Sequence, residues 1–334
     1  MYAIYDDIIN DLQNSGGISV YWHNLKIKLK NRLEIECYNG SNLKRDRKAP
    51  LLIHRYLNFN TKKESKHIFH SSYYRVSGNT NALNIVTVHD FVYEYYSKGL
   101  KKLIHQLQKK YSLFNAHGVI CISENTKRDL LKLYPQIDKN KIRVIYHGVS
   151  EEFYNIKDIN NNNTFKSLIF VGQRNGYKNF QILIDILGKK KDFNLVLVGG
   201  GSLTKHEKNK LKNINYKHHQ NISNTELNIL YNNSFALIYP SLYEGFGLPI
   251  LESLKAGCPV ICNDGSSTKE IGGKYVLKGE MTTDFIIDSL EKLMNQKYRH
   301  KLIFEGINYA LTFTWEKTAK ETLDLYKKLW EKFQ

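Results

Sequence analysis

The sequence predicts an α/β protein built from two doubly wound parallel sheets. Three observations predict this fold class. Apolar, strand-like runs alternate with helical patterns in both halves of the chain, which is typical of parallel sheets. A polar, asparagine-rich stretch at 158–164 interrupts the alternation, as a linker between domains does. The chain has 334 residues, which is too long for one ordinary core and suits two domains of about 150 residues each.

The first half of the chain carries four predicted strands and a glycine loop. Ser123 follows the third strand and is placed to cap the helix that runs towards Tyr134. In chain order the elements are a strand at 2–5, a glycine loop at 15–19, a helix at 20–30, strands at 84–90 and 117–122, the helix after Ser123, and a strand at 141–146.

The second half restarts the alternation after the linker. Its predicted elements are a strand at 167–172, a helix from about 179, a strand at 193–198, a glycine turn at 199–201, a strand at 235–239 and a final amphipathic helix at 312–330. Open α/β sheets bind ligands beyond the carboxyl ends of their strands. We therefore expect binding residues directly after these strands.

The most informative segment is the strand, turn and helix start at 235–252. Gly245 and Gly247 allow the backbone to approach a ligand closely, and Pro249 suits a first helical turn. The N-H groups of such a helix start favour a phosphate or diphosphate. Glu244 and Glu252 stand on either side of the turn. They are either a catalytic or sugar-binding pair, or acids that only complement the helix dipole.

Glu244 and Glu252, with Gly-Phe-Gly-Leu-Pro after the first acid, resemble the signature of retaining glycosyltransferases of the group 1 (family 4) type. The resemblance runs along nearly the whole chain and is strongest at 235–270. It implies the GT-B fold, in which two Rossmann-like domains face a cleft and a C-terminal helix crosses back to the N-terminal domain. We expect an acceptor-side domain at 1–157, with 314–334 packing back on it, and a nucleotide-sugar domain at 158–313.

The resemblance also implies roles for the residues of this segment. Glu244 would lie against the transferred sugar, and Glu252 would bind the ribose hydroxyls of the donor. Backbone N-H groups of Phe246, Gly247 and Leu248 would contact the sugar and the diphosphate.

Four residues elsewhere match further positions of the family. Arg174 and Lys178 follow the 167–172 strand, where they either neutralise a diphosphate leaving group or remain solvated loop cations. The family places an Arg and a Lys of this loop against the donor phosphates, which favours the first interpretation. Gly17 resembles the glycine loop beside those phosphates, with a plain turn as the alternative. His89 resembles the histidine that reaches towards the donor sugar, with a buried polar core residue as the alternative.

The reaction implied by the resemblance is retaining transfer of one hexose from GDP-mannose or a UDP-hexose. The acceptor would be a hydroxyl of a lipid-linked or surface glycan, such as lipopolysaccharide O-antigen or capsule. Cations and amides at the phosphates would stabilise the leaving nucleoside diphosphate. The Asp-x-Asp pattern of metal-dependent sugar transferases is absent from the sequence, so we expect that no metal or other cofactor is required.

Charge and hydropathy point to the compartment. Of the net charge of +17, +12 falls in residues 1–150. Apolar residues recur at helical spacing among lysines at 98–110, which indicates either a basic helix on an anionic membrane surface or an ordinary solvated helix. No apolar stretch is long enough to span a bilayer, and the first residues lack signal-peptide features. We expect a cytoplasmic protein, peripheral on the cytoplasmic face of the inner membrane.

Two other classes of protein share some of these features. A GT-B nucleotide-sugar epimerase has the same fold and nucleotide but lacks the turn with two glutamates. A nucleic-acid-binding protein would explain the positive charge, yet the basic residues are not interleaved with a recognition module, so we expect no nucleic-acid partner.

Overall fold

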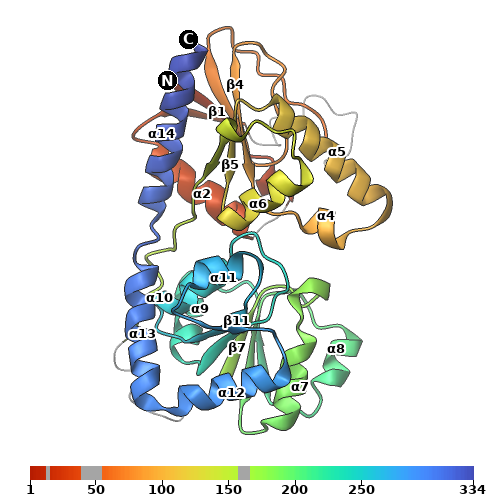
Figure 1. The fold of residues 1–334 in the computed structure, drawn as a ribbon, viewed down its shortest axis with the longest axis vertical. Coiled ribbons are helices and arrows are strands. Elements are labelled where there is room, and N and C mark those ends of the chain that lie inside the picture. The colour runs from red at the N-terminus through yellow and green to blue at the C-terminus, as the bar shows by residue number, and fades with distance from the viewer. Residues whose placement is uncertain (13–15, 39–54, 157–165) are drawn as a thin grey trace. The chain divides into compact units, whose positions relative to one another are not determined.

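The computed structural model describes residues 1–12, 16–38, 55–156 and 166–334. The chain forms two compact units, of which unit 1 comprises Met1–Gly148 with Thr314–Gln334 and unit 2 comprises Val149–Phe313. The predicted linker at 158–164 and the predicted boundary at 157/158 lie outside the described residues. Both units contain a parallel sheet with helices packed on it, which confirms the predicted fold class (Figure 1).

The sheet of unit 1 has the strand order β2-β1-β3-β4-β5-β6, and all of its pairings are parallel. The chain steps from β1 to β2 on one side and to β3 on the other, so the order reverses between β1 and β3. The strands are β1 (Tyr2–Asp6), β2 (Glu34–Tyr38), β3 (His67–Ser71), β4 (Ala82–Val88), β5 (Gly118–Cys121) and β6 (Ile142–Val144).

Strands β2 and β3 were not predicted from the sequence. All five residues of β3 are buried, including His67 and His70, which break the apolar pattern expected of a buried strand. Both imidazoles are hydrogen bonded inside the unit: His67 Nε2 lies 2.7 Å from the Thr61 hydroxyl, and His70 Nε2 lies 2.8 Å from the Thr87 hydroxyl. Satisfied hydrogen bonds therefore allow this polar sequence to form a central strand.

The helices of unit 1 include one from the far end of the chain. Helix α14 packs on α2 and begins at Trp315, because the Thr314 side chain accepts a hydrogen bond from the Lys317 N-H and caps it. The predicted cap Ser123 is confirmed, with its hydroxyl 3.0 Å from the Thr126 nitrogen. The helices are α1 (Ile9–Leu12), α2 (Gly17–Leu29), α4 (Val92–Tyr96), α5 (Gly99–Asn115), α6 (Glu124–Leu133) and α14 (Trp315–Phe333).

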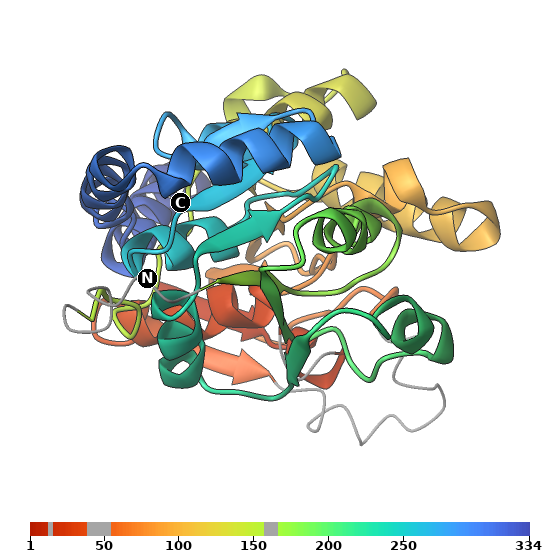
Figure 2. The ribbon, with the colours of Figure 1, turned by 90° about the horizontal axis from the view of Figure 1, so that it is seen from below.

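Unit 2 has the strand order β12-β11-β10-β7-β8-β9, again with parallel pairings, and the order reverses between β7 and β10. Its helices lie on both faces of the sheet (Figure 2). The strands are β7 (Ser167–Val171), β8 (Asn194–Val198), β9 (Tyr216–His219), β10 (Ala236–Tyr239), β11 (Val260–Asn263) and β12 (Leu277–Gly279). The helices are α7 (Gln181–Lys189), α8 (Lys205–Lys210), α9 (Asn224–Asn232), α10 (Leu248–Lys255), α11 (Ser266–Gly272), α12 (Thr283–Met294) and α13 (Gln296–Ala310).

No helix within the described ranges is long and apolar enough to cross a lipid bilayer.

Candidate functional site

Two of the predicted site residues meet at the point where the strand order of unit 2 reverses. Lys178 follows β7 and Glu244 follows β10, and their side chains form an ion pair with a 2.6 Å separation between Nζ and Oε1. The side chains are 15% and 12% exposed, so the pair is largely but not completely shielded from water. The Leu242 N-H donates to the Tyr177 carbonyl at 2.8 Å and ties the two loops together.

Tyrosine rings surround the lysine of this pair. The Lys178 ammonium lies 5.2 Å from the centre of the Tyr177 ring and 5.9 Å from that of Tyr239, both within range of a cation-π interaction. Burial, together with the neighbouring Glu244 carboxylate, raises the pKa of Tyr239 well above its usual value. Tyr239 therefore stays a neutral phenol beside the two charges.

The predicted turn and helix start follow directly after Glu244. Gly247 has φ 106° and ψ 51°, a left-handed conformation that favours glycine, and helix α10 begins at Leu248 with Pro249 in its first turn. The N-H groups at the start of a helix have no partner within that helix, and the helix dipole makes the region electropositive. The backbone of Gly247 and Leu248 thus has the geometry of an anion-binding helix start beside the Lys178 ammonium.

Glu252 lies on α10 and has different surroundings from Glu244. Its Oε2 accepts a hydrogen bond from the Tyr231 hydroxyl at 3.1 Å, and Tyr231 is fully buried. Burial raises the pKa of Glu252 to about 7, although the Tyr231 hydrogen bond acts in the opposite direction. The two acids of the motif therefore differ, since Glu244 is paired with a cation and Glu252 only with a phenol.

Arg174 is held away from this ion pair. Its Nε donates to Glu207 Oε1 at 2.7 Å, and its Nη1 and Nη2 donate to the carbonyls of Gly199 and Gly200 at 2.9 and 3.0 Å. A Cβ atom on Gly200, where φ is 76°, would lie 2.3 Å from Nη1. Arg174 thus supports the predicted glycine turn in this structure, and its contact with a donor phosphate stays a prediction.

Glu207 was not singled out from the sequence. It forms a capping box with Thr204 at the start of α8, and it holds Arg174 with the same carboxylate. The Thr-Lys-His-Glu sequence at the start of this short helix, with Thr204 as its cap, was the available signal.

The other predicted residues lie in unit 1. Gly17 is the first residue of α2. His89 follows β4 and is 7% exposed, and its buried Nε2 has no hydrogen-bond partner among the residues that the structure describes. Burial, with a smaller contribution from the Lys109 ammonium, lowers the pKa of His89 to about 3. His89 is therefore a neutral imidazole near the carboxyl end of β4.

A buried chain of hydrogen bonds, which the sequence did not reveal, crosses unit 1 close to His89. The Tyr326 hydroxyl lies 2.8 Å from the Tyr5 hydroxyl and 2.5 Å from His70 Nδ1, and His70 Nε2 bonds to Thr87. Burial lowers the pKa of His70 to about 3. This chain links α14 to strands β1, β3 and β4 without any charged group.

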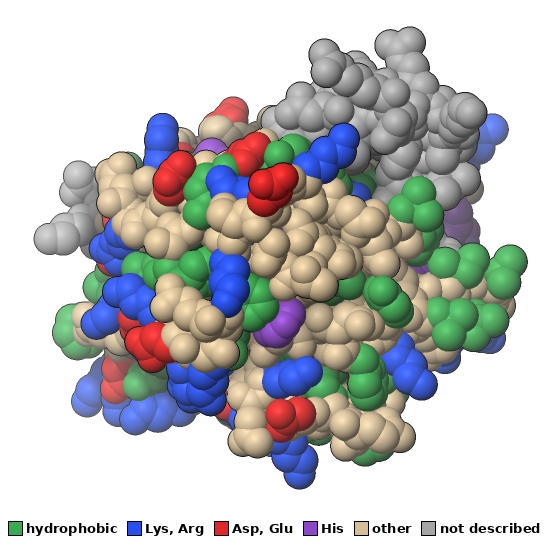
Figure 3. Space-filling view, turned by 90° about the horizontal axis from the view of Figure 1, so that it is seen from above, with side chains coloured by type: hydrophobic (Ala, Val, Ile, Leu, Met, Phe, Trp, Pro, Cys, Tyr) green, Lys and Arg blue, Asp and Glu red, His purple; other side chains and the backbone are tan. Residues whose placement is uncertain are grey.

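Helix α5 exposes an apolar stripe. Its sequence contains no acidic residue. Figure 3 shows hydrophobic side chains gathered at the right-hand edge of the molecule, the side on which α5 lies in Figure 1. The stripe consists of Leu100, Leu103, Ile104, Leu107, Tyr111 and Phe114, which are 39–71% exposed. Large exposed apolar patches of this kind mark interaction surfaces.

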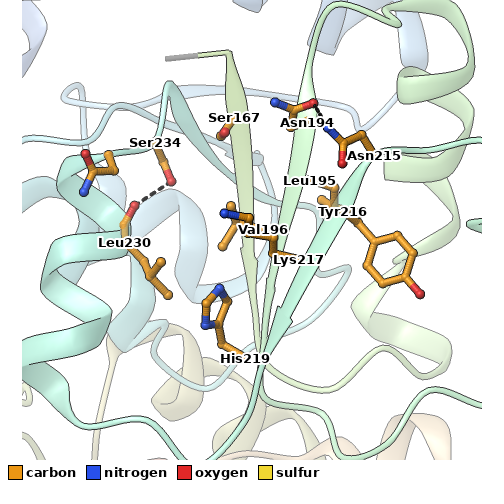
Figure 4. Close-up of a pocket in the computed structure, with 11 residues that line it drawn as sticks. Ser167, Asn194, Leu195, Val196, Asn215, Tyr216, Lys217, His219, Leu230 and Ser234 are labelled. Atoms are coloured by element: carbon orange, nitrogen blue, oxygen red, sulfur yellow. Dashed lines mark hydrogen bonds between the residues drawn. The ribbon is translucent and has the colours of Figure 1, made fainter. Parts of the chain in front are cut away.

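A cavity of about 340 Å³ lies elsewhere in unit 2, between α9 and strands β7 to β9, and none of the predicted site residues lines it (Figure 4). His219 stands at one end of the cavity, and Ser167 and Ser234 stand at the other (Figure 4). The His219 Nε2 atom is buried and has no hydrogen-bond partner in the described ranges. Within the described part of the chain, no cluster of three or more His, Cys, Asp or Glu side chains is arranged to hold a metal ion.

Comparison with protein families matches both units of the chain. Residues 150–309 match the family model for glycosyl transferases group 1, and residues 15–153 match that for glycosyltransferase family 4.

Three curated relatives are similar over part of their length. The O-antigen chain mannosyltransferase RfbU of Salmonella typhimurium is 32% identical over 188 residues, which are 54% of this chain and 51% of that protein. The O-antigen chain mannosyltransferase B of Escherichia coli is 34% identical over 110 residues, or 32% of this chain and 29% of that protein. An uncharacterized glycosyltransferase of Methanocaldococcus jannaschii is 31% identical over 228 residues, which are 66% of this chain and 62% of that protein. The chain thus spans 29 to 62% of the length of these relatives.

Solved structures resemble the chain over nearly its whole length. Sucrose-phosphate synthase of Thermosynechococcus elongatus has a TM-score of 0.77 at 16% identity and covers 99% of this chain and 100% of its own. HepE of Anabaena, solved in complex with UDP-glucose, has a TM-score of 0.73 at 13% identity and covers 98% and 100%. These likenesses confirm the GT-B fold.

Proposed function

Because the chain belongs to the group 1 glycosyltransferases, we propose that it transfers a hexose from a nucleoside-diphosphate sugar to a hydroxyl of a glycan, with retention of the anomeric configuration. The observation that carries this proposal is the ion pair of Lys178 and Glu244 beside the α10 helix start. A cation, free helix N-H groups and a carboxylate at one strand edge suit a ligand that joins a diphosphate to a sugar.

In the proposed mechanism, some of these groups bind the diphosphate and others bind the hydroxyls of the sugar and the ribose. Cleavage of the sugar-phosphate bond leaves an anionic nucleoside diphosphate, which the Lys178 ammonium and the N-H groups at the start of α10 stabilise. Glu244 orients the hydroxyls of the transferred sugar, and Glu252 accepts hydrogen bonds from the ribose. Because these protein groups stabilise the negative charge of the diphosphate, the transfer requires no metal ion.

The identity of the sugar is proposed from the relatives. Two of them are named as O-antigen chain mannosyltransferases, and a structural neighbour was solved with UDP-glucose. We propose GDP-mannose or a UDP-hexose as donor and a lipid-linked or surface glycan, such as O-antigen or capsule, as acceptor.

The exposed stripe of α5 supports a membrane-bound acceptor. Leu103 and Leu107 are 50% and 58% exposed, and the absence of acids on the helix favours contact with anionic lipids. We propose that α5 holds the protein peripherally on the cytoplasmic face of the inner membrane.

A thermal-shift experiment with GDP and UDP tests the donor site, since a ligand that binds only the folded state raises the melting temperature. We expect one of the two to stabilise the protein by several degrees, and Lys178→Met to remove most of that shift by deleting the cation at the phosphates. Absence of stabilisation by both nucleotides contradicts the proposed function.

Sedimentation with lipid vesicles tests the membrane contact. Leu103→Ser with Leu107→Ser should abolish binding to vesicles that contain anionic lipid. Phe304→Ser is the matched control, because Phe304 is 69% exposed but lies on α13 in unit 2. Equal binding by all three proteins contradicts the role of α5.

A further inference from the structure

Two adjacent serines hold the turn that follows Glu244. The Ser267 hydroxyl lies 2.9 Å from the Glu244 carbonyl and 2.8 Å from the Phe246 carbonyl, and it donates to both. The Ser266 hydroxyl accepts from the Glu244 N-H at 3.1 Å. Both serines begin helix α11 directly after β11, so a neighbouring strand edge supports the turn. Ser267 is fully buried and cannot touch a ligand itself.

The hydrogen bonds of Ser267 determine which way the peptide groups of the turn face. A trans peptide is planar and directs its C=O and N-H groups to opposite sides, and no cis peptide occurs among the described residues. Because the Phe246 carbonyl points inward to Ser267, the N-H of Gly247 in the same peptide points outward. This N-H lies at the helix start, where an anion is favoured.

Ser266 adopts a backbone conformation that favours glycine, yet its side chain makes a hydrogen bond. Its φ is 48°, and it is one of three non-glycine residues with positive φ in the described ranges. A non-glycine residue in this region carries a conformational cost relative to glycine. Glycine would remove that cost but also the hydroxyl that binds the Glu244 N-H, so the hydroxyl offsets the strain.

We propose that Ser267 is a positioning residue, which aims the Gly247 N-H at the β-phosphate of the donor, and that Ser266 fixes the backbone of Glu244 beside it. The inference rests on the proposed function, since it assigns the diphosphate contact of the same site. Without the Ser267 hydroxyl, the 246–247 peptide is free to rotate, and the N-H loses its fixed direction towards the charge that develops on the leaving group.

The test compares Ser267→Ala with Ser234→Ala. Ser234 is the matched control, because it is buried in unit 2 and its hydroxyl also donates to a backbone carbonyl, that of Leu230, at 2.6 Å. Dissociation constants are measured for whichever of GDP and UDP stabilises the wild-type protein, and for the corresponding monophosphate. Both variants should lower the stability of the protein by similar amounts. A change in binding or catalysis that only Ser267→Ala shows is therefore not a consequence of reduced stability.

Ser267→Ala should weaken diphosphate binding about tenfold and leave monophosphate binding within about twofold, since only the diphosphate reaches the Gly247 N-H. With donor and acceptor present, kcat should fall about a hundredfold with little change in KM for the acceptor. Ser234→Ala should change neither the ratio of diphosphate to monophosphate affinity nor the ratio of kcat to KM. Equal losses for the diphosphate and the monophosphate, or losses matched by Ser234→Ala, overturn the inference.

Two variants of Ser266 test the inference even if Ser267→Ala does not fold. Ser266→Gly removes the hydroxyl and relieves the backbone strain, whereas Ser266→Ala removes the hydroxyl and keeps the strain. Both should lower kcat about tenfold, although only Ser266→Ala should lower the melting temperature markedly. Full activity of Ser266→Gly overturns the role of the hydroxyl. If neither GDP nor UDP binds the wild-type protein, the proposed function fails first, and this inference fails with it.

Discussion

The two units have similar parallel sheets but different chemistry where the strand order reverses. Numbered within each unit, the strands run 2-1-3-4-5-6 in unit 1 and 3-2-1-4-5-6 in unit 2. In unit 2 the reversal carries a Lys178–Glu244 ion pair and a helix start. In unit 1 the neighbouring strand ends carry His70 and His89, whose pKa values burial lowers to about 3, so both are uncharged near neutral pH.

We propose that this difference gives the two similar sheets separate tasks. A diphosphate needs cations and N-H donors, and in the proposed reaction the charged edge of unit 2 supplies them. A sugar hydroxyl needs neutral acceptors and donors of fixed geometry, and in the proposed reaction the uncharged imidazole of His89 is the acceptor in unit 1, because both nitrogens of His70 already bond to Tyr326 and Thr87. Substitutions in unit 2 should therefore alter nucleotide affinity, transfer or both, whereas substitutions in unit 1 should alter transfer without altering nucleotide affinity.

The largest expected effect is at Glu244. Glu244→Gln keeps the shape of the side chain but removes the charge that pairs with Lys178 and, in the proposed reaction, orients the sugar, so transfer should fall about a thousandfold. Thermal stabilisation by the nucleoside diphosphate should persist, because Lys178 remains free to bind the phosphates. Glu226→Gln on α9 serves as the control, since its carboxylate only caps that helix. Loss of nucleotide binding and transfer together would contradict the separate role of Glu244.

The next effect is at His89 and tests the other half of the comparison. His89→Asn should lower transfer about 10- to 100-fold, because it removes a buried acceptor nitrogen, and should leave the nucleotide-induced thermal shift unchanged. The pH profile of transfer between 5 and 8 should show no inflection from His89, whose pKa lies far below that range. His67→Asn is the control for a buried histidine with both nitrogens paired. A reduced nucleotide-induced thermal shift in His89→Asn would contradict the proposal that unit 1 does not contribute to nucleotide affinity.

A smaller effect concerns pH and Glu252. Ribose hydroxyls bind best to an ionised carboxylate, and the pKa of Glu252 is about 7, so nucleotide affinity should fall up to about tenfold per pH unit below 7 and level off above it. Glu252→Gln should remove this dependence. Titration calorimetry at pH 5.5 to 8.5 measures both proteins, and a slope retained by Glu252→Gln would assign the proton to another group.

The same carboxyl also makes stability depend on pH. Its pKa in the folded protein lies above the ordinary glutamate value, so its contribution to stability is complete below about pH 4.5 and is lost as pH rises through about 7. The free energy of unfolding of the wild type should therefore fall relative to that of Glu252→Gln across this interval. A constant difference in denaturant unfolding would contradict the raised pKa.

The smallest effect on transfer is expected at Arg174. Its guanidinium is hydrogen bonded to Glu207 and the glycine turn, so Arg174→Met should lower the free energy of unfolding by about 3 kcal/mol and reduce transfer less than tenfold. Denaturant unfolding and transfer rates measure the two effects. A hundredfold loss of transfer without loss of stability would instead support the predicted contact with the donor phosphates.

The sequence predicted those parts of the fold that have an apolar pattern. The strand predicted at 167–172 was recognised in this way and the turn at Gly247 from its glycines, whereas β3 was missed because two histidines interrupt it. The contact between Lys178 and Glu244 joins residues 66 positions apart, so only the folded sheet brings them together. Ser267 was missed for a similar reason, since its importance lies in two carbonyls on another loop.

The origin of unit 1 in two distant parts of the chain has a consequence for protein synthesis. Residues 149–313 leave the ribosome as a continuous segment, so unit 2 has its complete sequence before α14 is made. Unit 1 lacks until then the buried side chains of α14, among them Tyr326, which bonds to His70 and Tyr5. The nascent chain therefore completes its N-terminal unit last, and unit 1 exposes part of its core to chaperones throughout the translation of unit 2.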